Sequence, residues 1–156
     1  MQRRGRRIAM TPGEIDDFLG VERTCRVATL GGSGPHVTAL WFVWDGKSLW
    51  LNSLMPSRRW TDLRADSRIA VLVDTGGEYG ELRGVELRGR AVAVGEVPRT
   101  GAVVGELAEP ERLFALKYSG SDRMTHDGRH AWLRVTPDAI VSWDFRKLSA
   151  REGGDS

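Results

Sequence analysis

A chain of 156 residues, 40% of them hydrophobic and 28% charged, has the size and composition of one globular domain and is too short for two. No apolar run approaches the roughly 20 residues that a membrane-spanning helix needs, which excludes a helical membrane protein. The single cysteine, Cys25, excludes an internal disulfide and fits a reducing compartment, so we expect a cytoplasmic protein.

The net charge of +2 is unevenly distributed along the chain. Four arginines lie within the first seven residues, so the remainder is slightly acidic. We therefore expect a basic flexible arm over residues 1–10, a single domain over 11–148 and a mobile tail over 149–156. A basic arm could touch nucleic acid or lipid headgroups, but such arms are more often solvated. We expect neither nucleic acid nor a membrane as a partner.

Cap and turn signals divide the first part of the chain into a helix and three strands. The capping box Thr11-Pro-Gly-Glu14 begins a short helix that ends at Gly20. Strand patterns follow, and the dipeptide Asp45-Gly46 predicts a tight hairpin between the last two of them. The expected strands are Thr24–Leu30, Pro35–Trp44 and Lys47–Asn52.

The later part of the chain is also predicted to be rich in strands. Ile69–Val73 is a continuous apolar run typical of a central strand, and Gly84 and Gly89 mark bulges or bends in the strand pattern that follows it. The remaining expected elements are helices over Pro98–Ala108 and Pro110–Tyr118 and strands over His130–Thr136 and Ala139–Asp144, with a turn at Pro137-Asp138. Six or seven strands, mostly joined by hairpins, predict a mainly β fold built as an antiparallel barrel.

An anion site is predicted where the third strand ends and a short helix begins. Ser57 is a natural N-cap for that helix, so Arg58 and Arg59 fall on its first turn. The helix dipole disfavours cations at this end unless something negative lies nearby. Free backbone N–H groups together with a guanidinium fork can hold a phosphate or a carboxylate.

A simpler interpretation exists for one of the two arginines. Arg58 could pair with Asp62 four residues along the helix, as a surface ion pair. Arg59 faces Leu63 at the same spacing and has no such partner, so we interpret Arg59 as the anion ligand. Trp60 and Leu63 are expected to pack the helix onto the barrel.

Other chemistry is not indicated by the sequence. The histidines do not have a metal-binding spacing, because Gly128 separates His126 from His130 in a region that reads as a loop, so we expect no metal. Cys25 is expected to be a buried strand residue, with no base near it in the sequence. A nucleophile elbow and a phosphate-binding P-loop are both absent from the sequence.

The order of these segments resembles the pyridoxamine-phosphate-oxidase-like split barrels, a superfamily of flavin- and deazaflavin-binding proteins. The resemblance extends from Thr11 to Lys147. It is carried by the strand Arg26–Leu30, the helix–strand unit Ser57–Val73 and the closing Trp143-Asp-Phe-Arg-Lys147. It implies a six- to seven-stranded antiparallel split β-barrel that forms a homodimer, with cofactor grooves at the subunit interface.

Site residues can be carried over from the resemblance position by position. It implies that Arg59 holds the cofactor phosphate, with Arg58 and the helix-capping Ser57 beside it. It places the strand from Val37 to Trp41 against the ring system of the cofactor. The implied cofactor-binding residues are Val37, Thr38, Ala39, Leu40, Trp41, Asn52, Ser53, Ser57, Arg58 and Arg59. No catalytic residue is assigned.

The resemblance implies an oxidoreductase that binds reduced deazaflavin F-420, or FMN, and passes a hydride to a conjugated small-molecule acceptor. The C-terminus from Arg146 lacks the arginine- and tryptophan-bearing motif of true pyridoxamine phosphate oxidases, so vitamin B6 oxidation is not expected. The closing Trp143-Asp-Phe-Arg-Lys147 favours F-420 over FMN. Three alternatives stay open: a non-catalytic flavin- or deazaflavin-binding or storage protein, an FMN-dependent oxidase or reductase of the same fold, and a module that uses the basic arm.

Overall fold

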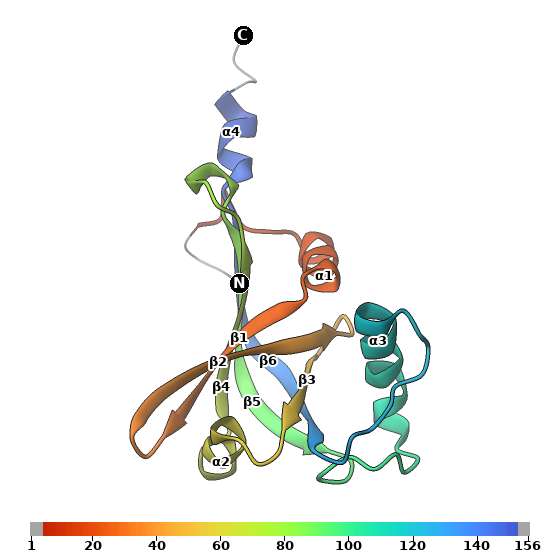
Figure 1. Cartoon of the computed structure of the whole chain (residues 1–156). Helices are drawn as coiled ribbons and strands as arrows, with labels where there is room; N and C mark the ends of the chain where they lie inside the picture. The colour runs from red at the N-terminus through yellow and green to blue at the C-terminus, as the bar shows by residue number, and fades with distance from the viewer. Residues whose placement is uncertain (1–4, 153–156) are drawn as a thin grey trace.

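Six antiparallel strands close into a barrel with the hydrogen-bonded order β1-β2-β3-β6-β5-β4. The structure is a computed structural model, which describes residues 5–152 and their side chains as far as Ser149. Figure 1 shows short helices at different sides of the barrel. In chain order the elements are α1 (Pro12–Val21), β1 (Thr24–Gly31), β2 (Gly34–Trp44), β3 (Leu49–Leu54), α2 (Arg58–Ala65), β4 (Arg68–Thr75), η1 (Tyr79–Glu81), β5 (Arg83–Val94), η2 (Gly105–Leu107), α3 (Ala108–Ser119), β6 (His130–Asp144) and α4 (Arg146–Glu152).

The barrel predicted from the strand pattern is confirmed, but two local predictions are wrong. The two expected final strands are one continuous strand, β6. Pro137 fits within it because it lies opposite Gly89, where the register between β5 and β6 shifts and the ladder is irregular. A Cβ atom at Gly89 would lie 2.7 Å from the carbonyl oxygen of Thr136, so this bulge requires glycine.

The second wrong prediction is the helix over Pro98–Ala108. This segment is a loop that ends in the single turn η2, and helix α3 begins at Ala108. Gly101 has a φ of +104°, which breaks a right-handed helix. The guanidinium group of Arg99 also binds the carbonyl oxygen of Ala102, so the loop closes around this side chain.

Two apolar clusters hold the fold together. The larger one fills the barrel and includes Val27, Phe42 and Leu133 together with Trp60 and Leu63, so α2 packs onto the barrel as predicted. The smaller one lies between the barrel wall and α3. Its buried members are Val43, Trp50, Val94, Leu107 and Trp132, with Leu113, Phe114 and Tyr118 of α3 packed against them.

The barrel wall opens between β2 and β3. These strands pair only over Phe42–Trp44 and Leu49–Leu51, next to their hairpin. Beyond that point β2 continues alongside β1, and Asn52–Leu54 of β3 continue alongside β6. The two strands therefore diverge, and the side chains at the divergence come from the segments that the sequence analysis selected as a cofactor site.

The ends of the described chain are anchored to the barrel. The carbonyl oxygen of Ile8 accepts a hydrogen bond from the backbone of Asp144, and Met10 is buried in the core. Part of the expected basic arm therefore packs on the barrel, and residues 1–4 lie outside the described range. The expected tail begins inside α4, and residues 153–156 are not described. Among the described helices, none is long and apolar enough to cross a membrane.

Candidate functional site

Helix α2 places one arginine in the opening between β2 and β3. The Oγ atom of Ser57 accepts a hydrogen bond from the backbone of Trp60, which confirms Ser57 as the N-cap. The buried side chains of Trp60 and Leu63 then fix the rotation of the helix against the barrel. Arg59 points inward as a result, and only 7% of its surface is exposed.

The buried guanidinium group of Arg59 contacts hydroxyl groups and no acid. Its Nε atom donates to Ser53 Oγ at 3.1 Å, and its Nη1 atom donates to Thr38 Oγ1 at 2.6 Å. Across residues 5–149, no carboxylate forms an ion pair with it. Burial therefore lowers the pKa of Arg59, because the charged form loses its hydration without gaining an opposite charge. We call Arg59, Ser53 and Thr38 the arginine cluster.

This arrangement is suited to an anion. Removing a cation from water costs several kcal/mol, and here no negative charge offsets that cost. The hydroxyl groups of Ser53 and Thr38 can accept from Arg59 and also donate to an oxyanion. A phosphate at this point would receive charge-assisted hydrogen bonds, which are the strong ones.

Arg58 is exposed beside the cluster and does not form the ion pair with Asp62 that its spacing allows. Its Nη1 atom donates to Ser33 Oγ at 2.9 Å, in the turn between β1 and β2. Asp62 is only 4% exposed and accepts a hydrogen bond from Thr29 Oγ1 at 2.8 Å. Tertiary contacts thus replace the local pair, and the Arg58 side chain reaches the turn of the β1–β2 hairpin.

The partners of Asp62 fix α2 to the β1–β2 hairpin. Nδ1 of His36 lies 3.9 Å from the Asp62 carboxylate, across from the Thr29 hydroxyl. The hairpin approaches so closely here that a Cβ atom at Gly31 would lie 2.5 Å from Asp62 Oδ1. This contact holds the helix that carries Arg59 in place.

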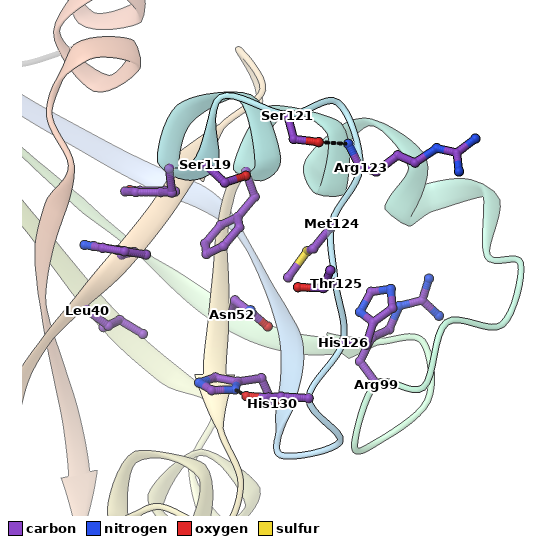
Figure 2. A pocket seen from close by; sticks show the side chains of 14 residues that line it. Leu40, Asn52, Arg99, Ser119, Ser121, Arg123, Met124, Thr125, His126 and His130 are labelled. Atoms are coloured by element: carbon purple, nitrogen blue, oxygen red, sulfur yellow. Dashed lines mark hydrogen bonds and ion pairs between the residues drawn. The ribbon is translucent and has the colours of Figure 1, made fainter.

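A second group of predicted residues lines a cavity of about 770 Å³ between the barrel wall and α3. Leu40, Trp41 and Asn52 line it from β2 and β3, as Figure 2 shows in part. Its other side is formed by α3 and the loop 120–129. We call this cavity the α3 pocket. The Oδ1 atom of Asn52 is buried and has no hydrogen-bond partner among the described residues.

The structure thus divides the predicted residues into four groups. Thr38, Ser53 and Arg59 form the arginine cluster, and Leu40, Trp41 and Asn52 line the α3 pocket. Ser57 caps α2, and Arg58 lies at its exposed edge. Val37 and Ala39 point out of the barrel and are exposed.

The sequence analysis missed the residues that α3 and its neighbouring loops contribute. Arg99 is 5% exposed and binds Glu111 through Nε and Nη2, at 2.8 and 2.9 Å, and also binds Glu96. Glu111 accepts a further hydrogen bond from the indole of Trp132 at 3.0 Å. The available signal was weak: aromatic side chains at i,i+4 spacing on α3, Phe114 and Tyr118, mark the face turned to the pocket.

The single cysteine is buried in β1. Burial raises the pKa of the Cys25 thiol to about 12, so this thiol is protonated and unreactive at neutral pH. Its predicted burial in a strand is confirmed. No group of three potential metal ligands occurs among the described side chains.

Comparison with known proteins gives one family and several similar structures. A model of the family described as pyridoxamine 5'-phosphate oxidase matches residues 11–144. The structure of a conserved hypothetical protein from Mycobacterium tuberculosis is similar, with 32% identity, a TM-score of 0.77, and coverage of 96% of this chain and 92% of that one. Among curated proteins, none matches significantly.

Two further solved structures are similar in fold alone. An FAD-binding protein from Mesorhizobium loti has 19% identity and a TM-score of 0.66, with 86% of this chain and 93% of that chain covered. An F-420 reductase has 21% identity and a TM-score of 0.57, with 80% and 94% covered.

Proposed function

This chain belongs to the pyridoxamine 5'-phosphate oxidase family, and from that membership we propose that it is an oxidoreductase with a phosphate-bearing flavin-type cofactor. We prefer reduced F-420 to FMN. The preference is supported by the closing Trp143-Asp-Phe-Arg-Lys147 and by the similarity of fold to a protein named as an F-420 reductase. The acceptor is a conjugated small molecule.

The observation that carries this proposal is the buried guanidinium group of Arg59. A buried arginine normally has a carboxylate partner, because an uncompensated charge is costly away from water. Within residues 5–149, the side-chain partners of Arg59 are the hydroxyl groups of Thr38 and Ser53. A cofactor phosphate would supply the missing negative charge, and both hydroxyls could turn to donate to it.

The chain's own residues would then bind and orient the cofactor. Arg59, Ser53 and Thr38 would fix the phosphate, with Arg58 adding charge from the exposed side. The strand from Val37 to Trp41 would face the ring system. Such fixation improves rate by positioning the reacting groups. The bound cofactor would supply the hydride chemistry, as cofactors generally do.

We also propose that two copies of the chain associate. Leu30 and Val37 lie on one face of the β1–β2 hairpin, since Val37 pairs with Ala28 two residues from Leu30. These side chains remain 40% and 63% exposed. A second copy covering this apolar face would form a groove beside the opening of the barrel. Sedimentation analysis tests this proposal: a dimer is expected, and a monomer at micromolar concentration contradicts it.

Fluorescence titration with F-420 and with FMN tests cofactor binding. We expect saturable binding of F-420, and weaker binding of FMN. Arg59→Gln should reduce cofactor affinity by about 30- to 150-fold, because a charge-assisted contact of roughly 2–3 kcal/mol is lost. Arg64→Gln changes an exposed arginine of the same helix and should leave affinity unchanged. If wild type binds neither cofactor, or if R59Q binds like wild type, the proposal fails.

An acceptor screen separates catalysis from simple binding. Protein loaded with reduced cofactor is mixed with conjugated small molecules, and cofactor oxidation is followed by absorbance. Oxidation that depends on the acceptor and on the protein supports the oxidoreductase. Tight binding without turnover of any acceptor would favour a binding or storage protein with the same phosphate contacts.

A further inference from the structure

Helix α2 carries a second buried charge that lacks a permanent opposite charge. The carboxylate of Asp62 is 4% exposed and accepts a hydrogen bond from Thr29 Oγ1 at 2.8 Å. Within residues 5–149, no lysine or arginine forms an ion pair with it. A buried carboxylate is costly unless a cation balances it. Asp62 is therefore the counterpart of Arg59, the buried cation that lies three residues earlier in the same helix.

The base that faces this carboxylate is His36 of β2. Its Nδ1 atom lies 3.9 Å from Asp62 Oδ2, is buried, and has no hydrogen-bond partner among the described residues. The negative charge of Asp62 favours the tautomer that carries a proton on Nδ1. Because the His36 side chain is nevertheless 33% exposed, solvent reaches the ring through its other atoms. Nε2 is therefore the nitrogen that we expect to take up a second proton.

Strand β2 brings His36 close to the arginine cluster. His36 and Thr38 lie on the less exposed face of this strand, since residues two apart in a strand point to the same side. The strand rise places them about 7 Å apart. Thr38 Oγ1 accepts from Nη1 of Arg59 at 2.6 Å. One face of β2 thus reaches Asp62 through His36 and Arg59 through Thr38, so that a charge at one position affects the other.

The charges around His36 all come from α2. They are two cations, Arg58 and Arg59, and one anion, Asp62; Arg58 reaches the turn of the β1–β2 hairpin, where it donates to Ser33. Residues 27–40, which form most of that hairpin, contain no acid, lysine or arginine. A doubly charged anion bound at Arg59 would leave this group with a net negative charge. A proton on His36 would neutralise that excess.

We propose that anion binding at Arg59 is coupled to protonation of His36, whose imidazolium pairs with Asp62 through Nδ1. The inference rests on the anion site of the proposed function and adds regulation by pH to it. One proton comes from solvent as the anion binds to the neutral form. Coupling of this kind is reciprocal, so the proton must also raise the affinity for the anion. Affinity therefore rises as the pH falls through the range in which histidines titrate.

Calorimetric titration with sulfate tests the coupling. Sulfate resembles a phosphate group and stays doubly charged over this range, whereas groups of the cofactors themselves could titrate. Wild type is titrated at about pH 8 and at about pH 5.5, at constant ionic strength because salt screens the contact. We expect about five- to tenfold tighter binding at the lower pH. Equal affinities at the two pH values would overturn the coupling and leave the anion site standing.

Two variants assign the effect to its residues. His36→Gln keeps a polar side chain that does not titrate, so its sulfate affinity should agree within about twofold at the two pH values. Arg59→Gln should lose most of the sulfate affinity at both. Thermal melts first confirm that each variant is folded. A pH preference that persists in H36Q would overturn the role of His36. If wild type binds no sulfate at either pH, or R59Q binds it like wild type, the anion site and the coupling both fail.

Proton NMR gives a direct readout of the same linkage. The chain has three histidines, so the ring signal that disappears in H36Q identifies His36. Sulfate added at about pH 7 should raise the protonated fraction of His36. His126, whose Nε2 lies 3.7 Å from Glu111 of α3, is the internal control and should not respond. An equal response of His126, or none at His36, would overturn the proposal. No cofactor is present, so a failure of F-420 and FMN to bind would not alter this result.

Discussion

Two arginines of this chain are almost equally buried but have opposite surroundings. Arg99 is 5% exposed and lies against the carboxylates of Glu96 and Glu111, whereas Arg59 is 7% exposed and has hydroxyl groups as its side-chain partners in the described part of the chain. The pKa of Arg99 is raised, chiefly by its hydrogen bonds to Glu111, and the pKa of Arg59 is lowered by burial. Carboxylates of the described chain therefore compensate the charge of Arg99, whereas the charge of Arg59 has no such partner among the described residues.

This difference underlies the two roles that we assign, a structural role for Arg99 and the proposed ligand-binding role for Arg59. Arg99 joins the loop before α3 to α3 itself, and Trp132 of β6 joins the same network through Glu111. That network shapes the wall of the α3 pocket. Arg59 crosses the opening between β2 and β3, where an external anion would complete its surroundings. Burial alone does not identify a functional arginine, because its partners decide its role.

The largest expected effect is the loss of stability in Arg99→Gln. Removing one partner of a buried ion pair leaves the other uncompensated, which costs about 3–5 kcal/mol. Glu111 and Glu96 would be left without their cation. Urea unfolding followed by tryptophan fluorescence gives the free energy of unfolding. A loss below about 1 kcal/mol would show that the network is not structural.

A smaller loss is expected in Thr38→Val. This change keeps the shape of the side chain and removes the oxygen that accepts from Arg59 Nη1. A hydrogen bond to a charged group contributes about 1.5–3 kcal/mol, so the free energy of unfolding should fall by about that amount. The paired control Thr61→Val changes an exposed threonine of α2 and should stay within about 0.5 kcal/mol of wild type. Equal effects of the two changes would contradict the cluster geometry.

Acid should reduce the stabilisation that Arg99 provides, because this stabilisation depends on the negative charge of Glu111. Burial by itself raises the pKa of Glu111, but hydrogen bonds from Arg99 and Trp132 hold the pKa below its ordinary value. A carboxyl with a lowered pKa in the folded state adds stability at neutral pH and loses it as pH falls below about 4.3. The stability gap between wild type and R99Q should therefore narrow as the pH falls through and below about 4.3. Unfolding curves across this range that keep a constant gap would contradict the linkage.

The smallest effect should come from Arg64→Gln, the control on α2. Arg64 is exposed, and substitutions at such positions usually change the free energy of unfolding by less than about 0.5 kcal/mol. The same variant should also bind cofactor like wild type. A marked change in either measurement would mean that the effects of Arg59→Gln come from a disturbed α2 helix and not from the loss of the Arg59 guanidinium group.

Local signals in the sequence were sufficient to predict the barrel and the helix that carries Arg59. Ser57 is followed by a helix-compatible run, and the buried positions of Trp60 and Leu63 turn Arg59 inward. Strand patterns and the hairpin dipeptide Asp45-Gly46 predicted the antiparallel topology. These predictions depend on neighbours within a few residues, which a single sequence displays.

Contacts between distant segments could not be predicted in this way. The spacing of Arg58 and Asp62 suggested a pair, but Asp62 instead binds Thr29, which lies 33 residues away. Because of the bulge opposite Gly89, strand β6 continues through Pro137, where a turn was expected. The stacking of Trp41 on Tyr118 likewise joins β2 to α3. Such contacts arise only when the barrel closes.

One measurement tests the central claim that Arg59 contributes to ligand binding and not to the stability of the fold. Urea unfolding of wild type and Arg59→Gln is compared with and without saturating F-420. Without cofactor, we predict that R59Q is as stable as wild type or up to about 1 kcal/mol more stable, because the variant buries no unpaired charge. Cofactor should then stabilise wild type alone. A loss of several kcal/mol in cofactor-free R59Q, or equal stabilisation of both proteins, would contradict the account.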